Sequence, residues 1–503
     1  AHGRHPLAKE QNYSVTVFNG TERAQSAVAE AELKFMRGEE IRDFALIDEA
    51  GNSVPYEIID RREGLLDVFS PLNLPGVLDA DFTRIRFFAQ DIPAYTAKQF
   101  AVIPAKKGIL IAPSEQKRGI ENEFYEIFEE NGALVIADKR TGRRYFDPLR
   151  LEDSADKGDA YVYRVSPEAP LVLLPAAFGA AKCDALRSTL DVSFDYDCPA
   201  CYDFDRDCRS QEKVRNEVRL TLTLEKGSET IGISYRIVNR ARDHRMRILI
   251  ASGFAGGKLF TDSPYDYAER ESHESCDVTE SDTNHNSTFA QLVKDGRALI
   301  VYTQGQYETQ NVGGGLAFTL LRATGVINRN ALTYRTACGA QWDAPENQVL
   351  RTVEGRMGME YASERSGADC FVRAKFFRNG LICHADSFDS KKYSGGRFAV
   401  QTAELERLYY LKDPYAGKKT ASDSLLVCDC ASIVTTCRKK AEKGGTLLRF
   451  VNLSDAPQEV NFTFRGKMYL TDMPEETETF AGESQASVSF RPKQIVSVRI
   501  SDV

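Results

Sequence analysis

Histidines close to carboxylates are the residues of this sequence best suited to metal binding or acid–base chemistry, and they are few. The six histidines are at positions 2, 5, 244, 273, 285 and 384. His384 and Asp386 form a lone H-x-D pair late in the chain, among residues that read as strands, and we interpret it as a chance match. His244 and His273 are the two candidates for a His–carboxylate pair in the cleft of a complete hydrolase or epimerase.

Cysteine thiolates are the other candidate metal ligands. The chain has eleven cysteines, an odd number, and they are scattered along the sequence. Cys198, Cys201 and Cys208, with Cys183 upstream, form the densest group, but C-x2-C-x6-C lacks the second pair that structural zinc sites use. We therefore predict reduced thiols, no metal on this chain and a cytoplasmic location, and leave open whether these four cysteines bind a metal.

Charge and hydropathy exclude two classes of partner. The formal net charge is −8 and the pI about 5.6, and no basic stripe of the kind that binds phosphate backbones is present. No apolar run reaches the length of a membrane helix. We expect neither nucleic acid nor membrane as a partner, and a homo-oligomer stays open. The N-terminal residues 1–12 resemble neither a signal peptide nor a natural start, and we interpret them as the tail of a chain cut from a longer one. A tag remnant, a proteolytic product and a deliberately chosen start all fit this tail.

The elements that must position any site are predicted to be strands. Apolar residues alternate with polar ones over 218–224 and again over 231–237, and Lys226-Gly227 marks the turn between them, which is typical of a hairpin. Residues 21–35 have helical propensity, but Ala29, Leu33 and Phe35 fall on one face of a strand, and we predict a strand there.

The segment 120–163 has the most informative order of turns and strands. Tyr125 and Ile127 alternate with polar neighbours, Asn131-Gly132 tolerates the positive φ of a tight hairpin, and an apolar run returns over 134–137. A second turn is predicted over 138–142. Taken alone, this pattern indicates a β-meander that opens a sandwich.

The residues of this segment also resemble a family. An E-N-E-x-Y strand ending at Tyr125, a D-K-x-T-G turn and a D-A-Y triplet ending at Tyr161 are similar to the start of the large β-domain of family-38 glycoside hydrolases, the retaining α-mannosidases. Similar blocks follow in the same order at 260–270, 316–322 and 336–341. Upstream, 91–95 resembles D-V-P-x-x-G-Y, although the glycine is absent here. The resemblance runs from about Tyr13 to the C-terminus.

The resemblance implies a mainly β fold, with a large β-sandwich (a supersandwich, galactose-mutarotase-like) flanked by two smaller β-domains. The predicted parts are a tail at 1–12, a small β-domain at 13–104, a linker at 105–118, the large sandwich at 119–430 and a C-terminal β-domain at 431–503.

The resemblance further implies that this chain is the C-terminal half of an α-mannosidase acting on terminal α-mannosides. In the family, an Asp nucleophile and a zinc held by His and Asp belong to an N-terminal catalytic domain whose motifs are absent here. We expect no catalytic residue and no metal on this chain, zinc in the parent enzyme, and no activity from this chain alone. Tyr161 and Arg322 match two residues that form a wall of the family's active site, and both side chains can hydrogen-bond a sugar.

Two further functions stay open. A free-standing carbohydrate-binding module would show several exposed aromatic residues on one face, and Trp342 is the one tryptophan of the sequence. Alternatively, the parent enzyme hydrolyses an acidic mannoside such as mannosylglycerate.

Overall fold

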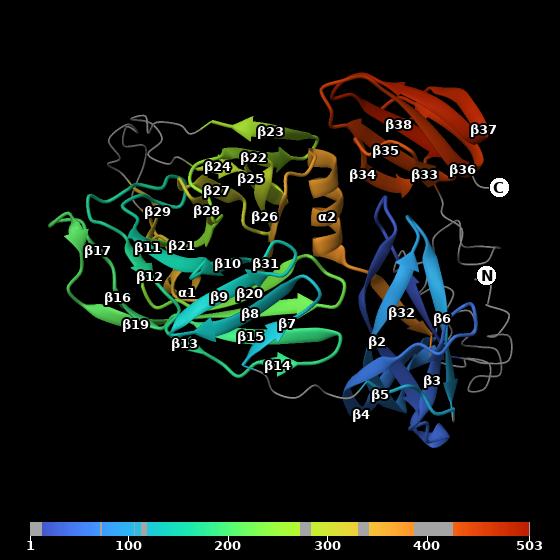
Figure 1. The fold of residues 1–503 in the computed structure, drawn as a ribbon, viewed down its shortest axis with the longest axis horizontal. Helices are drawn as coiled ribbons and strands as arrows, with labels where there is room; N and C mark the ends of the chain where they lie inside the picture. The colour runs from blue at the N-terminus through green and yellow to red at the C-terminus, as the bar shows by residue number, and fades with distance from the viewer. Residues whose placement is uncertain are drawn as a thin grey trace. The chain divides into compact units, whose positions relative to one another are not determined.

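The computed structural model describes residues 13–70, 73–104, 106–111, 118–271, 283–329, 342–386 and 426–501. The chain divides into two compact units, Ser114–Ala374 and the pair Ala1–Pro113 with Lys375–Val503. Regular structure in the described residues is almost entirely antiparallel sheet (Figure 1). The predicted fold class, mainly β with a large sandwich and two smaller β-domains, is confirmed.

Two large sheets form the sandwich of the Ser114–Ala374 unit. The six-stranded sheet has the order β12-β11-β21-β28-β27-β24, with bounds Leu171–Leu173, Leu149–Ala155, His244–Ala251, Gly315–Ala323, Glu308–Asn311 and Asn284–His285. The other sheet has the order β13-β15-β19-β20-β31-β26-β25-β22-β23, with bounds Ala177–Phe178, Arg187–Ser193, Lys213–Glu225, Ile231–Val238, Thr352–Ser363, Arg297–Gln304, Phe289–Lys294, Lys258–Ser263 and Asp266–Arg270. At its edge β14 (Lys182–Cys183) pairs with β15 and β16 (Tyr196–Pro199) with β19.

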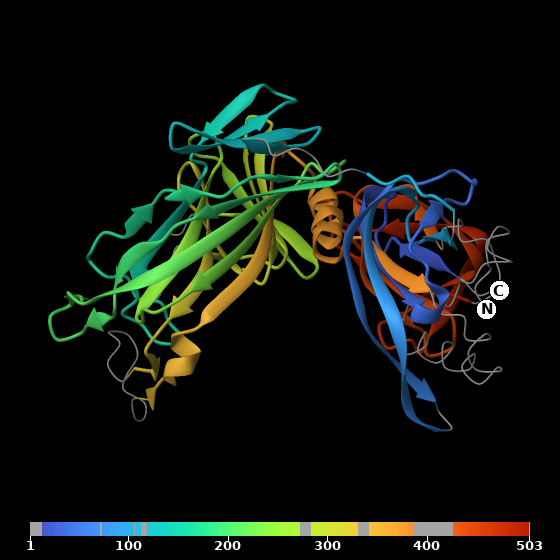
Figure 2. The same cartoon turned by 90° about the horizontal axis from the view of Figure 1, so that it is seen from below.

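A smaller sheet, β10-β9-β8-β7, packs on the sandwich (Figure 2). Its strands are Arg143–Phe146, Ala133–Asp138, Tyr125–Glu130 and Gly119–Glu121. Asn131 and Gly132 have φ of 54° and 84° in the turn between β8 and β9, as predicted. Side chains of this sheet, among them Tyr125 and Ile127, join the same buried cluster as both large sheets, so the small sheet shares a core with the sandwich.

Short elements complete this unit. Two of them are strand pairs, β17 (Tyr202–Asp203) with β18 (Cys208–Arg209) and β29 (Val326–Asn328) with β30 (Trp342–Asp343). The others are the helices α1 (Glu346–Val349) and α2 (Gly367–Asn379). The unit ends at Ala374, so the residues of α2 after Ala374 belong to the other unit. In the described part of the chain, no helix is long and apolar enough to cross a membrane.

The hairpin of β19 and β20 confirms the strongest sequence prediction. Val218, Leu220 and Leu222 are at most 1% exposed, and the residues between them face outward. Because the side chains of a strand alternate between its two faces, the apolar period of two buries one whole row against the facing sheet.

In the other unit, two sheets enclose a second core. The first has the order β3-β6-β1-β32, with bounds Phe44–Ile47, Ala97–Pro104, Ser14–Phe18 and Ile382–Asp386. The second has the order β2-β5-β4, with bounds Gln25–Met36, Asn73–Ile92 and Tyr56–Ser70, and the 3-10 turn η2 (Arg37–Glu39) follows β2. The predicted strand within 21–35 is therefore confirmed. Its polar face carries Glu30, which pairs with Arg86 of the adjacent β5, and Glu32, which pairs with Arg62 of β4. These contacts suit a strand despite the helical propensity.

One strand departs from the predicted division of the chain. The large sandwich is predicted to span residues 119–430, but β32 pairs with β1, with His384 opposite Thr16. β1 has β6 on its other side, so the return of β32 satisfies an edge that would otherwise expose backbone hydrogen-bonding groups. The H-x-D pair at 384–386 is thus part of a strand. The other predicted boundaries stay predictions.

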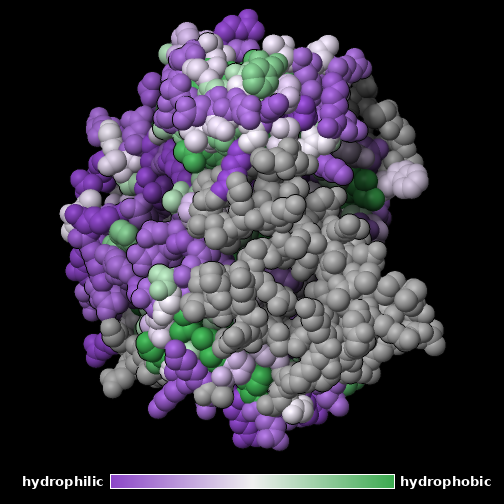
Figure 3. Space-filling view, turned by 90° about the vertical axis from the view of Figure 1, so that its right-hand side faces the viewer, coloured by the Kyte–Doolittle hydropathy of each residue, from purple (hydrophilic) through white to green (hydrophobic). Residues whose placement is uncertain are grey.

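The C-terminal region is one six-stranded sheet. Its order is β33-β36-β38-β35-β34 with β37 beside β36, and the bounds are Leu426–Cys428, Gln458–Thr471, Ile495–Ile500, Thr446–Asn452, Ile433–Lys440 and Glu478–Phe490. Its core includes Phe450, Phe462 and Phe490, all at most 1% exposed. On the face drawn in Figure 3, described residues are mainly hydrophilic, and the hydrophobic ones form small separate patches.

Candidate functional site

The loop of residues 156–163 follows β11 and carries Tyr161, the first predicted substrate-binding residue. Tyr161 is 72% exposed, whereas Asp156 and Asp159 of the same loop are fully buried. The backbone N–H groups of Tyr161 and Val162 donate to Asp159 Oδ1 at 2.9 and 3.0 Å. The loop therefore folds around a buried carboxylate and presents its tyrosine to solvent.

Arg322, the second predicted residue, lies in β28 and holds this loop. Its Nε donates to Asp156 Oδ2 at 2.9 Å, and its Nη2 donates to the carbonyl oxygen of Asp159 at 2.9 Å and lies 2.7 Å from Asp156 Oδ2 in an ion pair. Burial raises the pKa of the Asp156 carboxyl, and the charge of Arg322 opposes that rise. A side chain at position 158 would collide with the loop itself, because a Cβ on Gly158 would lie 1.7 Å from the carbonyl oxygen of Val162.

The structure thus ties both predicted residues to one loop, through Asp159. Nε and Nη2 of Arg322 contact Asp156 and the loop backbone, so Arg322 also holds the Tyr161 loop in place. A direct contact of either residue with a sugar stays a prediction.

His244 does have the carboxylate partner considered in the sequence analysis, but the pair is enclosed. Its Nδ1 lies 2.8 Å from Asp153 Oδ2 and its Nε2 lies 2.9 Å from Asn239 Oδ1. Neither His244 nor Asp153 has any exposed side-chain surface. The pair therefore offers no cleft in which a substrate could react, and we interpret it as part of the core. The other candidate, His273, lies outside the described residues.

Asp153 is the centre of this buried network. It accepts a hydrogen bond from the Tyr196 hydroxyl at 2.5 Å, and Arg209 pairs with it. Burial alone would raise the pKa of the Asp153 carboxyl, but His244, Arg209 and Tyr196 together hold that pKa well below its usual range. Asp153 is therefore charged in the folded protein.

The same network contains one group that could be taken for a metal site. Asp153, Cys198 and His244 bring three ligand atoms within 4.8 Å of one another, and this group includes one of the four cysteines considered above. The residues do not fit zinc, because Arg209 Nη2 lies 3.3 Å from Cys198 Sγ and its cation also contacts the carboxylate. Burial and the charge of Asp153 also raise the pKa of the Cys198 thiol, whereas zinc binds the thiolate.

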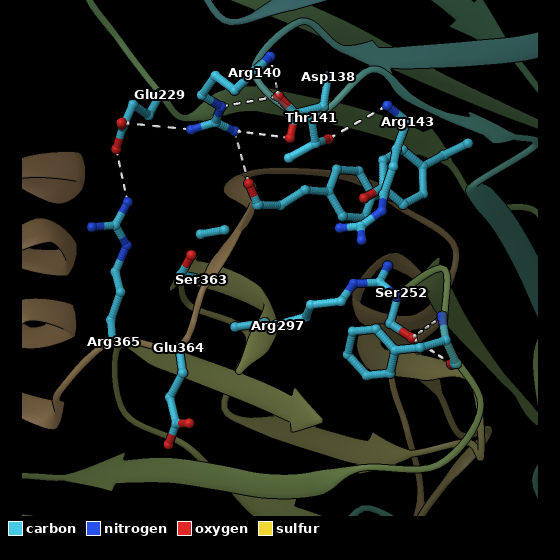
Figure 4. Close-up of a pocket in the computed structure, with 15 residues that line it drawn as sticks. Asp138, Arg140, Thr141, Arg143, Glu229, Ser252, Arg297, Ser363, Glu364 and Arg365 are labelled. Carbon is cyan, nitrogen blue, oxygen red and sulfur yellow. Dashed lines mark hydrogen bonds and ion pairs between the residues drawn. The ribbon is translucent and has the colours of Figure 1, made fainter. Parts of the chain in front are cut away.

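A hollow of about 310 Å³ lies near β10, β26 and β31 (Figure 4). Its charged lining consists of Asp138, Arg140, Arg143, Glu229, Arg297, Glu364 and Arg365. Arg140 pairs with Asp138 at 3.0 Å and with Glu229 at 3.5 Å, and Arg365 pairs with Glu229 at 2.7 Å. Because these charges neutralise one another within the wall, we interpret the hollow as a solvated ion-pair network.

Sequence reasoning missed Arg245, a buried residue of β21 that lies directly opposite Arg322 in the strand register. The ring centroid of Tyr163 lies 3.6 Å from Arg245 Cζ and 5.8 Å from Arg322 Cζ. One sequence pattern could have pointed to Arg245. In His244-Arg-Met-Arg247 the two arginines are two residues apart, so they lie on one face of a strand.

We predict that Arg322→Met lowers the free energy of unfolding by about 3 kcal/mol, because it leaves the Asp156 carboxylate buried without its cation. The double variant Arg322→Met/Asp156→Asn should lose less than the sum of the two single variants. Urea unfolding followed by circular dichroism measures all three. Arg236→Met is the control, since it breaks an exposed pair with Glu354 and should change stability by less than about 1 kcal/mol. Additive losses would show that the pair is not coupled.

We also predict that Asp153→Asn weakens the acid dependence of stability. The pKa of Asp153 is lower in the folded than in the unfolded protein, so its contribution is present above the unfolded pKa of about 3.9 and is lost as the pH falls below it. Between about pH 5 and pH 3, the unfolding free energy should therefore fall less steeply in the variant than in the wild type. Urea unfolding at several pH values measures this, with the exposed Asp197→Asn as control. Parallel curves for Asp153→Asn and wild type would contradict it.

Part of the chain matches a known family, and most of it is similar to a named protein. Residues 432–498 match the family described as "Glycosyl hydrolases family 38 C-terminal beta sandwich domain". A protein of Halalkalibacterium halodurans named "Putative mannosylglycerate hydrolase" is 28% identical over 418 residues, which are 78% of this chain and 42% of that protein.

Two solved structures share the fold. An alpha-mannosidase from Enterococcus faecalis V583 aligns with a TM-score of 0.79 at 17% identity, over 99% of this chain and 57% of that one. A family-38 protein from Enterococcus faecalis aligns with a TM-score of 0.76 at 18% identity, over 99% and 59%. The chain therefore spans less than half of the curated relative and less than two thirds of each solved chain. The resemblance found in the sequence is confirmed: residues 432–498 match a C-terminal domain of family-38 glycoside hydrolases, and the whole chain shares its β-rich fold with part of two solved structures from that group.

Proposed function

We propose that this chain is the C-terminal part of a retaining glycoside hydrolase that acts on terminal α-mannosides, and that it supplies one wall of the active site. The observation that carries the proposal is the exposed Tyr161 on a loop fixed by Arg322, in a chain similar to family-38 enzymes. The partner of this wall is an N-terminal catalytic domain.

The proposed division of labour follows from what retaining hydrolysis needs. Two carboxyl groups about 5 Å apart flank the scissile bond, one as nucleophile and one as acid and base. We assign both carboxyl groups, and the zinc of the parent enzyme, to the N-terminal domain. When bound there, zinc would act as a Lewis acid near the sugar.

Tyr161 contributes binding and orientation. Its phenol can donate and accept hydrogen bonds with a sugar hydroxyl, and its ring offers an apolar face. Because Asp159 and Arg322 fix the backbone of the loop, less conformational freedom is lost when the tyrosine meets a sugar.

An acidic mannoside is a second candidate substrate. The name of the Halalkalibacterium relative refers to mannosylglycerate, whose aglycone is the carboxylic acid glycerate. Arg245, a buried arginine with two unpartnered guanidinium nitrogens among the described residues, lines a cavity beside the Tyr161 loop and favours this candidate. The nine described cysteines are all unpaired, which supports our proposal of a reducing, cytoplasmic setting.

We predict that Tyr161→Phe, made in a longer protein that includes the N-terminal domain, lowers kcat/KM for an aryl α-mannoside by about fivefold, the loss of one hydrogen bond worth about 1 kcal/mol. Thermal stability should not change, because the hydroxyl is exposed. The exposed Tyr265, changed to Phe in the same protein, is the matched control and should leave kcat/KM unaltered.

The 503-residue chain alone should not hydrolyse the same substrate. Turnover by a preparation free of longer enzyme would place the catalytic carboxyls on this chain. Equal kinetics for Tyr161→Phe and Tyr265→Phe would remove the tyrosine from the active-site wall.

A further inference from the structure

A cavity of about 200 Å³ lies beside the Tyr161 loop, within the sandwich unit. It is bordered by side chains of β11, β21 and β27 and by the segment 163–170. At about 30 Å³ per water molecule, this is room for about six waters, or for one small organic acid.

Arg245 is the unusual member of its lining. It is 5% exposed, and its Nε and Nη1 are buried without a hydrogen-bond partner among the described residues. Its guanidinium rests on the ring of Tyr163, 3.6 Å from the centroid, and burial lowers the pKa of Arg245 from its ordinary value. A buried cation without an anion is costly, so such a group calls for a ligand.

The carboxylates around Arg245 are engaged by other groups. The charge of Glu308 acts on Arg245, but Glu308 forms its hydrogen bonds with the hydroxyls of Thr283 and Thr319. Glu152 accepts from Nε of Arg247 at 2.8 Å, and Nη2 of Arg247 lies 2.7 Å from the same carboxylate oxygen in an ion pair. Asp156 is held by Arg322. Glu168, which also lines the cavity, accepts from the backbone N–H of residue 209 at 2.7 Å. Arg247 therefore has its anion within the protein and Arg245 does not, although the two lie on one face of β21.

Hydroxyl partners complete the cavity. Ser154 Oγ and the Tyr163 hydroxyl lie 3.5 Å apart, and Ser166 lines the same space. The hydroxyl groups of a bound anion could form hydrogen bonds with these side chains. Glu168 is an acceptor, so it suits a hydroxyl of the ligand and would repel a carboxylate of the ligand.

We propose that this cavity binds the carboxylate of a small hydroxy acid, the aglycone of an acidic mannoside, with Arg245 as its ligand. A planar carboxylate matches the guanidinium fork in a bidentate pair. The choice of hydroxy acid rests on the proposed function, whereas the carboxylate site rests on the cavity and on its unpaired arginine.

Calorimetric titration of the 503-residue chain with D-glycerate tests the proposal, with glycerol as the uncharged counterpart. Glycerate should bind and glycerol should not. Arg245→Met should weaken glycerate binding by at least about tenfold, since it removes a charge-assisted bidentate contact. Arg245→Lys keeps the charge without the fork and should fall between. Arg236→Met, far less buried at 56% side-chain exposure, should bind like the wild type.

Thermal unfolding without ligand separates a binding arginine from a structural one. Arg245→Met removes an unpaired buried cation and should keep or raise the melting temperature. Arg247→Met leaves Glu152 without its partner and should lower it. The proposal is overturned if Arg245→Met and Arg245→Lys destabilise the chain as Arg247→Met does, if they bind glycerate as tightly as wild type, or if inorganic phosphate binds more tightly than glycerate.

Failure here is distinguishable from failure of the proposed function, because binding is measured without turnover. Hydrolysis of α-mannosides by the longer protein, with no glycerate binding, would refute the carboxylate site alone. Glycerate binding that depends on Arg245, in a longer protein without α-mannosidase activity, would refute the proposed function and keep the site.

Discussion

The buried ion pair between Arg322 and Asp156 is the interaction on which the candidate site depends. It joins a central strand of the six-stranded sheet to the loop that follows β11. Asp156 could not be left without its cation in this setting, because an unpaired buried carboxylate costs several kcal/mol. The loop is therefore fixed to the rigid part of the sandwich, and the exposed position of Tyr161 is a consequence of that attachment.

The charges around this pair are not balanced within the protein. Across β21 and β28, Arg245 stands opposite Arg322, and Arg247 lies two residues further along. Two of the three arginines have a buried carboxylate partner, and Arg245 has none among the described residues. A folded protein tolerates such an unbalanced charge where function uses it, which is why we place a ligand rather than a structural ion there.

Local patterns predicted much of this fold from the sequence. The alternation in β19 and β20 and the Asn131-Gly132 turn needed no tertiary information, because each follows from the two faces of a strand or from a tolerated positive φ. The return of β32 to β1 was not predictable, since the pairing joins residues more than 360 positions apart. The burial of Arg245 was not predictable either. It depends on β11, β21 and the segment 163–170, which come together only in the folded chain.

The central claim is that the Tyr161 loop faces the substrate. A crystal structure of a longer protein that includes the N-terminal domain, with a bound mannose-like inhibitor, tests it most directly through one distance. We predict that the Tyr161 hydroxyl lies about 3 Å from a sugar hydroxyl, a hydrogen-bond distance, with Arg322 still paired to Asp156. A sugar contacted by the N-terminal domain alone, with Tyr161 directed into solvent, would contradict the account.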